Sequence, residues 1–101
     1  MSEPESSHET HRREATIRNR QGVHFRPAGK LMLLANEFES EITIEYEGNR
    51  IDAKTGATAL ITCAIPYGAT LTIEARGTDA EKSLDAIVAL VNDHFGMNEY
   101  D

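Results

Sequence analysis

The chain has 101 residues, which predicts a single domain with a core of modest size. Its 17 acidic against 10 basic residues give a net charge of −7, which argues against general binding to nucleic acid, because the phosphate backbone would be repelled. The single cysteine excludes an internal disulfide, and no apolar run approaches the ~20 residues of a membrane span, so we expect a cytoplasmic protein without membrane contact.

Polar side chains dominate residues 1–14, so this segment has little apolar surface to bury. Burial cannot then offset the entropy lost on ordering, and we expect a mobile N-terminal extension. His8 and His11 lie three residues apart there and, with Glu9, have the chemistry of metal ligands. Incidental histidines in a mobile tail explain the pattern more simply, and we predict no metal site and no cofactor.

The first regular elements are a short strand and a helix that begins near a proline. Residues 15–19 alternate in the manner of a strand, and residues 20–22 break the alternation. From Pro27 onward, apolar side chains recur with the spacing of one helical face, and proline is favoured in the first turn of a helix. The members of this face are Ala28, Leu31, Met32, Ala35 and Phe38.

Residues 41–46 show the clearest alternation in the chain, which predicts a strand with one buried and one solvated face. Residues 47–49 indicate a hairpin turn, and a return strand follows through residues 51–53. A sheet that is solvated on one face favours antiparallel pairing, because parallel sheets are covered on both faces. The residues of the first strand that we predict to face the core are Ile42, Ile44 and Tyr46.

Two further helices flank a last strand at residues 70–76. The first of them is predicted to run from Thr55, as its N-cap, to Ala64, and a proline, tyrosine and glycine segment ends it. The second is predicted to open with a capping box at residues 78–81, and its apolar stripe extends to Phe95.

The elements thus follow in the order strand, helix, two strands, helix, strand, helix. Helices packed on one face of a four-stranded antiparallel sheet form an α+β domain of two layers. We assign this domain to residues 15–97 and a short C-terminal tail to residues 98–101. Nothing in the pattern requires more than a monomer.

The segment Gly22–Ala28 brings reactive chemistry to the start of the first helix. His24 is placed on the turn that enters the helix, close to main-chain N–H groups without partners and to the positive end of the helix dipole. Arg26 adds a planar fork of donors suited to phosphate oxygens. A nucleophilic imidazole beside an anion-binding helix start suits the task of accepting a phosphoryl group and passing it on.

This heptapeptide resembles the active-centre motif of HPr, the histidine-containing phosphocarrier of the bacterial sugar phosphotransferase system. The similarity extends from about Ala15 to about Phe95. It implies the HPr-like open-faced β-sandwich, with element order βαββαβα. It also implies that Nδ1 of His24 accepts a phosphoryl group from phosphorylated enzyme I and yields it to an enzyme IIA. The chain would then be a stoichiometric carrier rather than an enzyme.

The other residues of the motif are expected to support this centre. Gly22 would supply an unusual backbone angle or a close approach between segments. Pro27 would fix the entry of the helix, together with Ala28. Phe25 is bulkier than the small residue common at this place in the family, and either joins a docking surface or lies over the helix.

Thr55 is the second residue of interest. Many members of the family carry a serine at the matching place, preceded as here by alanine and lysine, which a regulatory kinase phosphorylates. The competing interpretation is an ordinary N-cap, worth about 1 kcal/mol. Gly56 and Ala57 also replace larger apolar residues that help dock enzyme I and the kinase. An alternative function is therefore a regulatory module, in which phosphorylation of His24, and of Thr55, controls a partner such as a transcription regulator.

Overall fold

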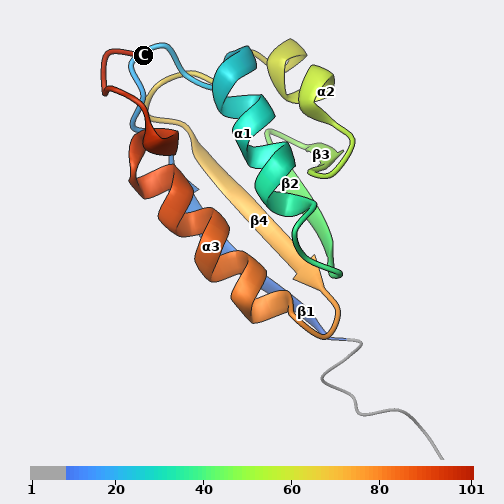
Figure 1. Ribbon diagram of the computed structural model, residues 1–101. Coiled ribbons are helices and arrows are strands. Elements are labelled where there is room, and N and C mark those ends of the chain that lie inside the picture. The colour runs from blue at the N-terminus through green and yellow to red at the C-terminus, as the bar shows by residue number, and fades with distance from the viewer. Residues whose placement is uncertain (1–8) are drawn as a thin grey trace, which may run out of the picture.

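Four antiparallel strands form a single sheet in the computed structural model, which describes residues 9–101 (Figure 1). The strands are β1 at Thr10–Thr16, β2 at Glu41–Tyr46, β3 at Asn49–Asp52 and β4 at Thr70–Arg76. They lie in the order β1–β4–β2–β3, so the first and last strands of the chain are neighbours. All three pairings are antiparallel, as the alternation predicts.

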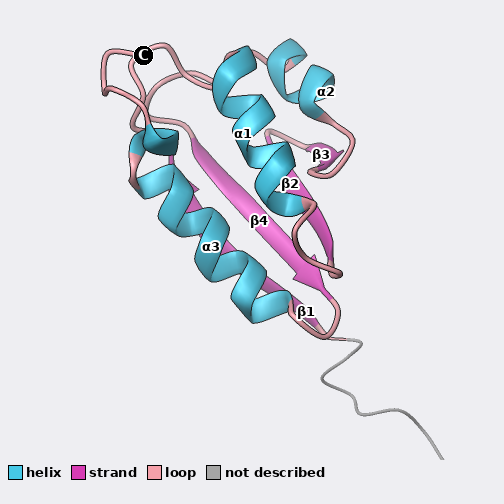
Figure 2. Ribbon diagram, viewed as in Figure 1, coloured by secondary structure: helices cyan, strands magenta, loops and turns pink. Residues whose placement is uncertain are grey.

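Three helices cover one face of this sheet and leave the other face open (Figure 2). They are α1 at Phe25–Ala35, α2 at Ala57–Thr62 and α3 at Ala80–Asn92. α1 lies between the other two helices, and α3 packs over β1 and β4. The predicted α+β open-faced sandwich, with its order βαββαβα, is confirmed. Within residues 9–101, no helix has the length and apolar character needed to cross a membrane.

The core lies between the sheet and the helices. Its side chains come from the positions that alternation and helical spacing predict, because every second strand residue and every third or fourth helix residue faces the same side. Tyr46 and Phe38 pack against this core but stay partly exposed. Its fully buried members include Leu31 of α1, Ile42 and Ile44 of β2, Leu71 and Ile73 of β4, and Leu84, Ile87 and Val91 of α3.

The first strand begins earlier than the alternation predicts, at Thr10 instead of Ala15. It pairs with β4 along the whole length of both strands. The expected mobile extension over residues 1–14 is therefore wrong for residues 10–14, which belong to the sheet. Residues 1–8 lie outside the described residues, and His8 is one of them.

Polar contacts with distant residues hold this early part of β1. Arg12 forms an ion pair with Glu74 of β4, with 3.2 Å between Nε and Oε2, and Arg13 forms one with Asp85 of α3. Main-chain hydrogen bonds to β4 also hold this part of the strand. Neither these ion pairs nor these main-chain hydrogen bonds depend on apolar side chains. The pattern of apolar residues therefore predicts a later start for the strand than the structure shows.

Thr55 is not the N-cap of the second helix. It lies exposed in the turn before α2, and Gly56 takes the N-cap position instead. A Cβ at Gly56 would overlap the main-chain oxygen of Asp52, so the absence of a side chain there lets the turn close. The N-cap interpretation of Thr55 is wrong, and the helix starts two residues after it.

The capping box predicted for the third helix is also not formed. Asp79 occupies the N-cap position of α3, but its carboxylate faces the loop after α1 rather than its own helix. It accepts hydrogen bonds from the main-chain N–H groups of Glu39 and Ser40, both at 2.9 Å, and from the Ser40 hydroxyl. Burial opposes ionisation, but these hydrogen bonds outweigh it and hold the pKa of Asp79 below its ordinary value. Asp79 therefore ties two loops together.

The third helix stops earlier than its apolar stripe predicts. α3 ends at Asn92, and a short 3-10 turn, His94–Gly96, follows. Within that turn Phe95 adopts a left-handed backbone, with φ of 56°, and its ring is fully buried. The apolar stripe thus predicts correctly that Phe95 lies in the core, although α3 ends before it.

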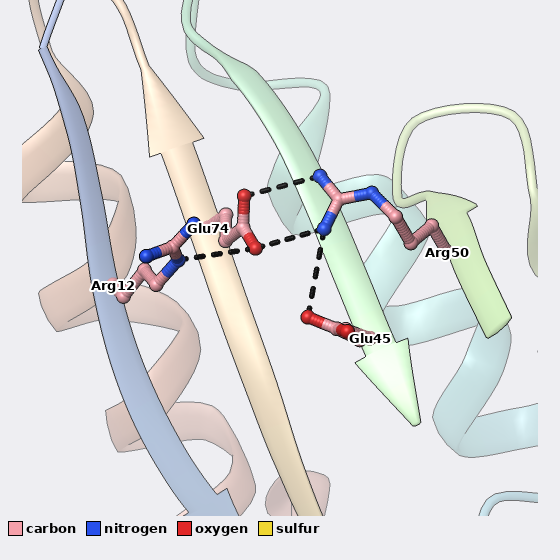
Figure 3. A network of polar contacts seen from close by, with 4 residues as sticks. All are labelled: Arg12, Glu45, Arg50 and Glu74. Carbon is pink, nitrogen blue, oxygen red and sulfur yellow. Dashed lines mark hydrogen bonds and ion pairs between the residues drawn. The ribbon is translucent and has the colours of Figure 1, made fainter. Parts of the chain in front are cut away.

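The open face of the sheet carries a network of charged side chains centred on Glu74 (Figure 3). Arg50 of β3 donates two hydrogen bonds to the Glu74 carboxylate, at 2.9 and 3.1 Å, and Arg12 approaches it from the other side. Hydrogen bonds from Arg50 lower the pKa of the Glu74 carboxyl most, and burial raises it. Together with the hydrogen bond from Arg12, they outweigh burial and lower the pKa of Glu74 from 4.5 to about 2. Glu74 is nearly buried, so it depends on these two partners.

Glu74→Gln is expected to lower stability at neutral pH, by about 2 to 3 kcal/mol, because an amide replaces a charged acceptor of two arginines. Since the pKa of Glu74 is lower in the folded chain than in the unfolded chain, its stabilisation is complete above 4.5 and is lost as the pH falls toward about 2. Urea unfolding at pH 7, 4 and 2.5 should therefore show the difference between the two proteins shrinking with falling pH. Glu14→Gln, an exposed carboxylate on the same face, is the control, and a difference for Glu74→Gln that does not change with pH would contradict the prediction.

Candidate functional site

A tight loop leads from β1 into α1 and carries the predicted site. Gly22 in this loop has a left-handed backbone, with φ of 69°, and a Cβ there would overlap the main-chain oxygen of Ile65. The N–H of Val23 donates to that same oxygen at 2.9 Å, and the N–H of Gly22 donates to the main-chain oxygen of Asn19, also at 2.9 Å. Both expected features of Gly22, an unusual angle and a close approach, are confirmed.

His24 is the N-cap residue of α1, and its backbone is extended. The chain turns into the helix directly after it, since the N–H of Ala28 donates to the His24 oxygen at 3.0 Å. Pro27 lies in the first turn, as predicted, and is buried. Among residues 9–101, no main-chain oxygen accepts from the N–H groups of Phe25 and Arg26. These two donors, at the positive end of the helix dipole, are available to an anion beside the half-buried His24 ring.

Arg26 is exposed in the same first turn of α1. Among residues 9–101 it forms no ion pair, whereas Arg12, Arg13 and Arg50 are all engaged with carboxylates. A cation at a helix N-terminus gains nothing from the helix dipole. Its guanidinium therefore remains available for an anion that binds at the helix start.

Apolar side chains surround His24 on the surface. A shallow depression of about 460 Å³ lies beside its ring, and Ile61, Ile65 and Tyr67 help to line it. Phe25 is 69 % exposed and packs the edge of its ring against the His24 ring, with 5.9 Å between ring centroids. Phe25 is therefore exposed beside His24, and its place in a docking surface stays a prediction. We call the exposed side chains of Phe25, Ile61 and Tyr67 beside His24 the apolar rim.

The predicted C-terminal tail is part of the site. The N–H of Arg20 donates to the Glu99 oxygen at 2.8 Å, and the His24 Nε2 lies 2.9 Å from the main-chain oxygen of Asp101. Figure 1 shows this end of the chain beside the start of α1. The sequence holds no signal of this contact, because the tail takes part through main-chain oxygens that any residue provides.

The remaining candidate residues lie apart from His24. Thr55 precedes the first residue of α2, whereas the depression beside His24 is lined by the other end of that helix. His11 of β1 approaches Glu9 and Glu81 at 3.8 and 3.7 Å. In the described part of the chain, no group of three His, Cys, Asp or Glu side chains is arranged to hold a metal ion.

Comparisons with known proteins agree with one another. Residues 11–93 match the model of a family described as PTS HPr component phosphorylation site. The chain is 36% identical over 87 residues to a phosphocarrier protein HPr of Cupriavidus necator, covering 86% of this chain and 97% of that protein. It is 41% identical over 83 residues to a phosphocarrier protein NPr of Shewanella violacea, covering 82% and 90% respectively. A crystal structure of HPr-C-His from Thermoanaerobacter tengcongensis superimposes with a TM-score of 0.80 at 27% identity, covering 87% of this chain and 98% of that one.

Proposed function

The chain belongs to the HPr family of phosphocarrier proteins, and we propose that it carries its phosphoryl group on Nδ1 of His24. One observation supports this most directly. His24 caps α1 beside two main-chain N–H groups that have no intrahelical acceptor, so a nucleophilic ring and an anion site lie together. None of the other described histidines has this setting.

The chemistry follows from these groups. The Nδ1 lone pair attacks phosphorus, the donor's bond to phosphorus breaks, and the electron pair of that bond stays with the donor. The N–H groups of Phe25 and Arg26 and the guanidinium of Arg26 stabilise the charge on the phosphoryl oxygens. Transfer to an acceptor is the same exchange in reverse, so the chain is restored and acts as a stoichiometric carrier.

We propose phosphorylated enzyme I as the donor and an enzyme IIA as the acceptor. Both must bring a reactive group to the same ring, so they must use the same surface in turn. The apolar rim around His24 offers that surface, because exposed aromatic and aliphatic side chains next to a reactive group are typical of docking sites. Because this surface is exposed and shallow, it suits partners that bind briefly and then dissociate.

Intact mass after incubation with phosphoenolpyruvate and a bacterial enzyme I tests this proposal. We expect one added phosphoryl group that is stable in alkali and lost in acid, as is typical of an N–P bond. Addition of an enzyme IIA should then return the mass to its starting value. Absence of uptake with several different enzymes I, from a folded sample, would overturn the proposal. Uptake without discharge by any enzyme IIA would instead favour the regulatory alternative.

Arg26→Ala is expected to slow phosphoryl uptake by about 100-fold, because removal of one preorganised donor to a developing charge costs this much in other sites. Arg26→Lys should recover part of the rate, since it keeps the charge but loses the planar fork. The rate is followed by intact mass in samples quenched at successive times. Lys30→Ala, an exposed cation one turn further along α1, is the control, and equal slowing in both proteins would count against a role for Arg26.

A further inference from the structure

A second surface depression, of about 370 Å³, shares Arg20 and Tyr67 with the depression beside His24. It lies where the chain leaves β1 and meets the turn after α3, and Arg18 and His94 contribute to its walls. Its volume falls in the lower part of the range of small-molecule sites, about 300 to 1,000 Å³. The function proposed above gives no role to Arg18, Arg20 or His94, so this depression is separate from the phosphoryl-transfer site.

Two exposed arginines, Arg18 and Arg20, line this depression. They alternate with the buried residues Ile17 and Asn19, so both side chains leave the extended chain on the same side. Among residues 9–101, neither guanidinium forms an ion pair, whereas arginines of β1 and β3 are engaged with carboxylates. In a chain with a net charge of −7, two such guanidiniums in one depression create a local positive potential, which attracts anions.

Contacts within the protein hold two of the basic side chains in place. The Arg20 guanidinium lies over the ring of Tyr67, at 5.4 Å, and over that of Tyr100, at 5.9 Å, and both are cation–π contacts. His94 has a left-handed backbone, with φ of 56°, and its main-chain oxygen accepts from Nδ2 of Asn19 at 2.9 Å. Asn19 is fully buried, so water does not compete for this hydrogen bond. The walls of the depression are therefore formed before any ligand binds.

We infer that this depression binds a small phosphate monoester. The dianion of a phosphate monoester matches the charge of two guanidiniums, and its three terminal oxygens can accept from both Arg18 and Arg20. A carboxylate has only two oxygens, which a single guanidinium fork already satisfies. The half-buried ring of His94 can donate a further hydrogen bond, and the exposed ring of Tyr67 offers an apolar surface to the organic part of the ligand.

The test is a titration of the full chain with glycerol 3-phosphate at constant ionic strength, followed by nuclear magnetic resonance of the main-chain N–H groups. We expect saturable shifts at Arg18 and Gly68, which line the depression, smaller shifts with acetate and none with glycerol. Arg18→Gln should weaken binding by about tenfold, the value of one hydrogen bond to a charged group. Glu99→Gln should strengthen binding by about threefold, because it removes the one carboxylate among the lining residues.

Arg26→Ala is the matched control, because the proposed anion site at the start of α1 would also take glycerol 3-phosphate. This variant removes an exposed arginine from that site and should leave the shifts at Arg18 and Gly68 unchanged. Shifts confined to the N–H groups of Phe25 and Arg26 would overturn the inference, and so would equal affinity in Arg18→Gln or equal shifts with acetate. The titration contains no phosphoryl donor, so a failure of the carrier function would be seen separately, as absence of phosphoryl uptake.

Discussion

His24→Ala is expected to take up no phosphoryl group under conditions in which the native chain is fully phosphorylated. Among residues 9–101, the substitution removes the only imidazole at the N-terminus of α1, and alanine offers no nucleophile. The fold should persist, because the ring is half-buried and contributes one hydrogen bond, worth about 1 kcal/mol. Intact mass and thermal melting measure the two properties.

His11→Ala is the control for this experiment. His11 is the second residue of β1 and contacts the carboxylates of Glu9 and Glu81. Figure 1 shows the beginning of β1 at the opposite end of the domain from the start of α1. Its replacement should leave phosphoryl uptake unchanged. If His24→Ala still gained an acid-labile phosphoryl group, another residue would be the acceptor and the proposed site would be wrong.

Gly22→Ala is expected to destabilise the fold by about 3 kcal/mol or more and to disrupt the His24 loop. Alanine is strained at a φ of 69°, and its Cβ would also overlap the Ile65 main-chain oxygen that Val23 binds. The loop can avoid the overlap only by giving up that hydrogen bond. Urea unfolding measures the loss of stability, and the rate of phosphoryl uptake shows the displacement of His24.

Gly29→Ala provides the matched comparison, since it makes the same chemical change within α1. No atom lies within 4 Å of a Cβ at Gly29, and the backbone there is helical. Alanine is favoured over glycine in a helix by about 1 kcal/mol, so this variant should gain stability. Similar effects of the two substitutions would contradict the role assigned to the Gly22 backbone.

Periodicity in the sequence predicts the order of strands and helices and a two-layer α+β domain, and the resemblance to HPr adds the open-faced sandwich. Ile42 and Ile44 are separated by polar residues because a strand turns alternate side chains to opposite faces, and this pattern appears in the sequence wherever one face is buried. The motif around His24 was equally accessible, because proline, glycine and a helix start constrain the backbone locally. Both rest on interactions between residues close in the chain.

Several of the features that differ from the prediction depend on contacts between distant residues. Asp79 was placed in a local capping box, but its carboxylate binds a loop 39 residues earlier. Arg12 belongs to β1 partly because Glu74 is opposite it. The contact between His24 and the Asp101 oxygen likewise joins residues 77 apart, and no side-chain pattern announces it. Propensity and spacing describe neighbours along the chain, so such pairings need the three-dimensional structure.

The two outer strands of the sheet carry features that disfavour strand pairing with another copy of the chain. An outermost strand has unpaired N–H and C=O groups that can hydrogen-bond a strand of another molecule, and proteins counter this with short strands and charged side chains. Here β3 has only four residues, and exposed Arg12, Arg13 and Glu14 line β1. A carrier that meets a donor and then an acceptor, as proposed above, would benefit from such edges, because aggregation between strands would remove it from the exchange.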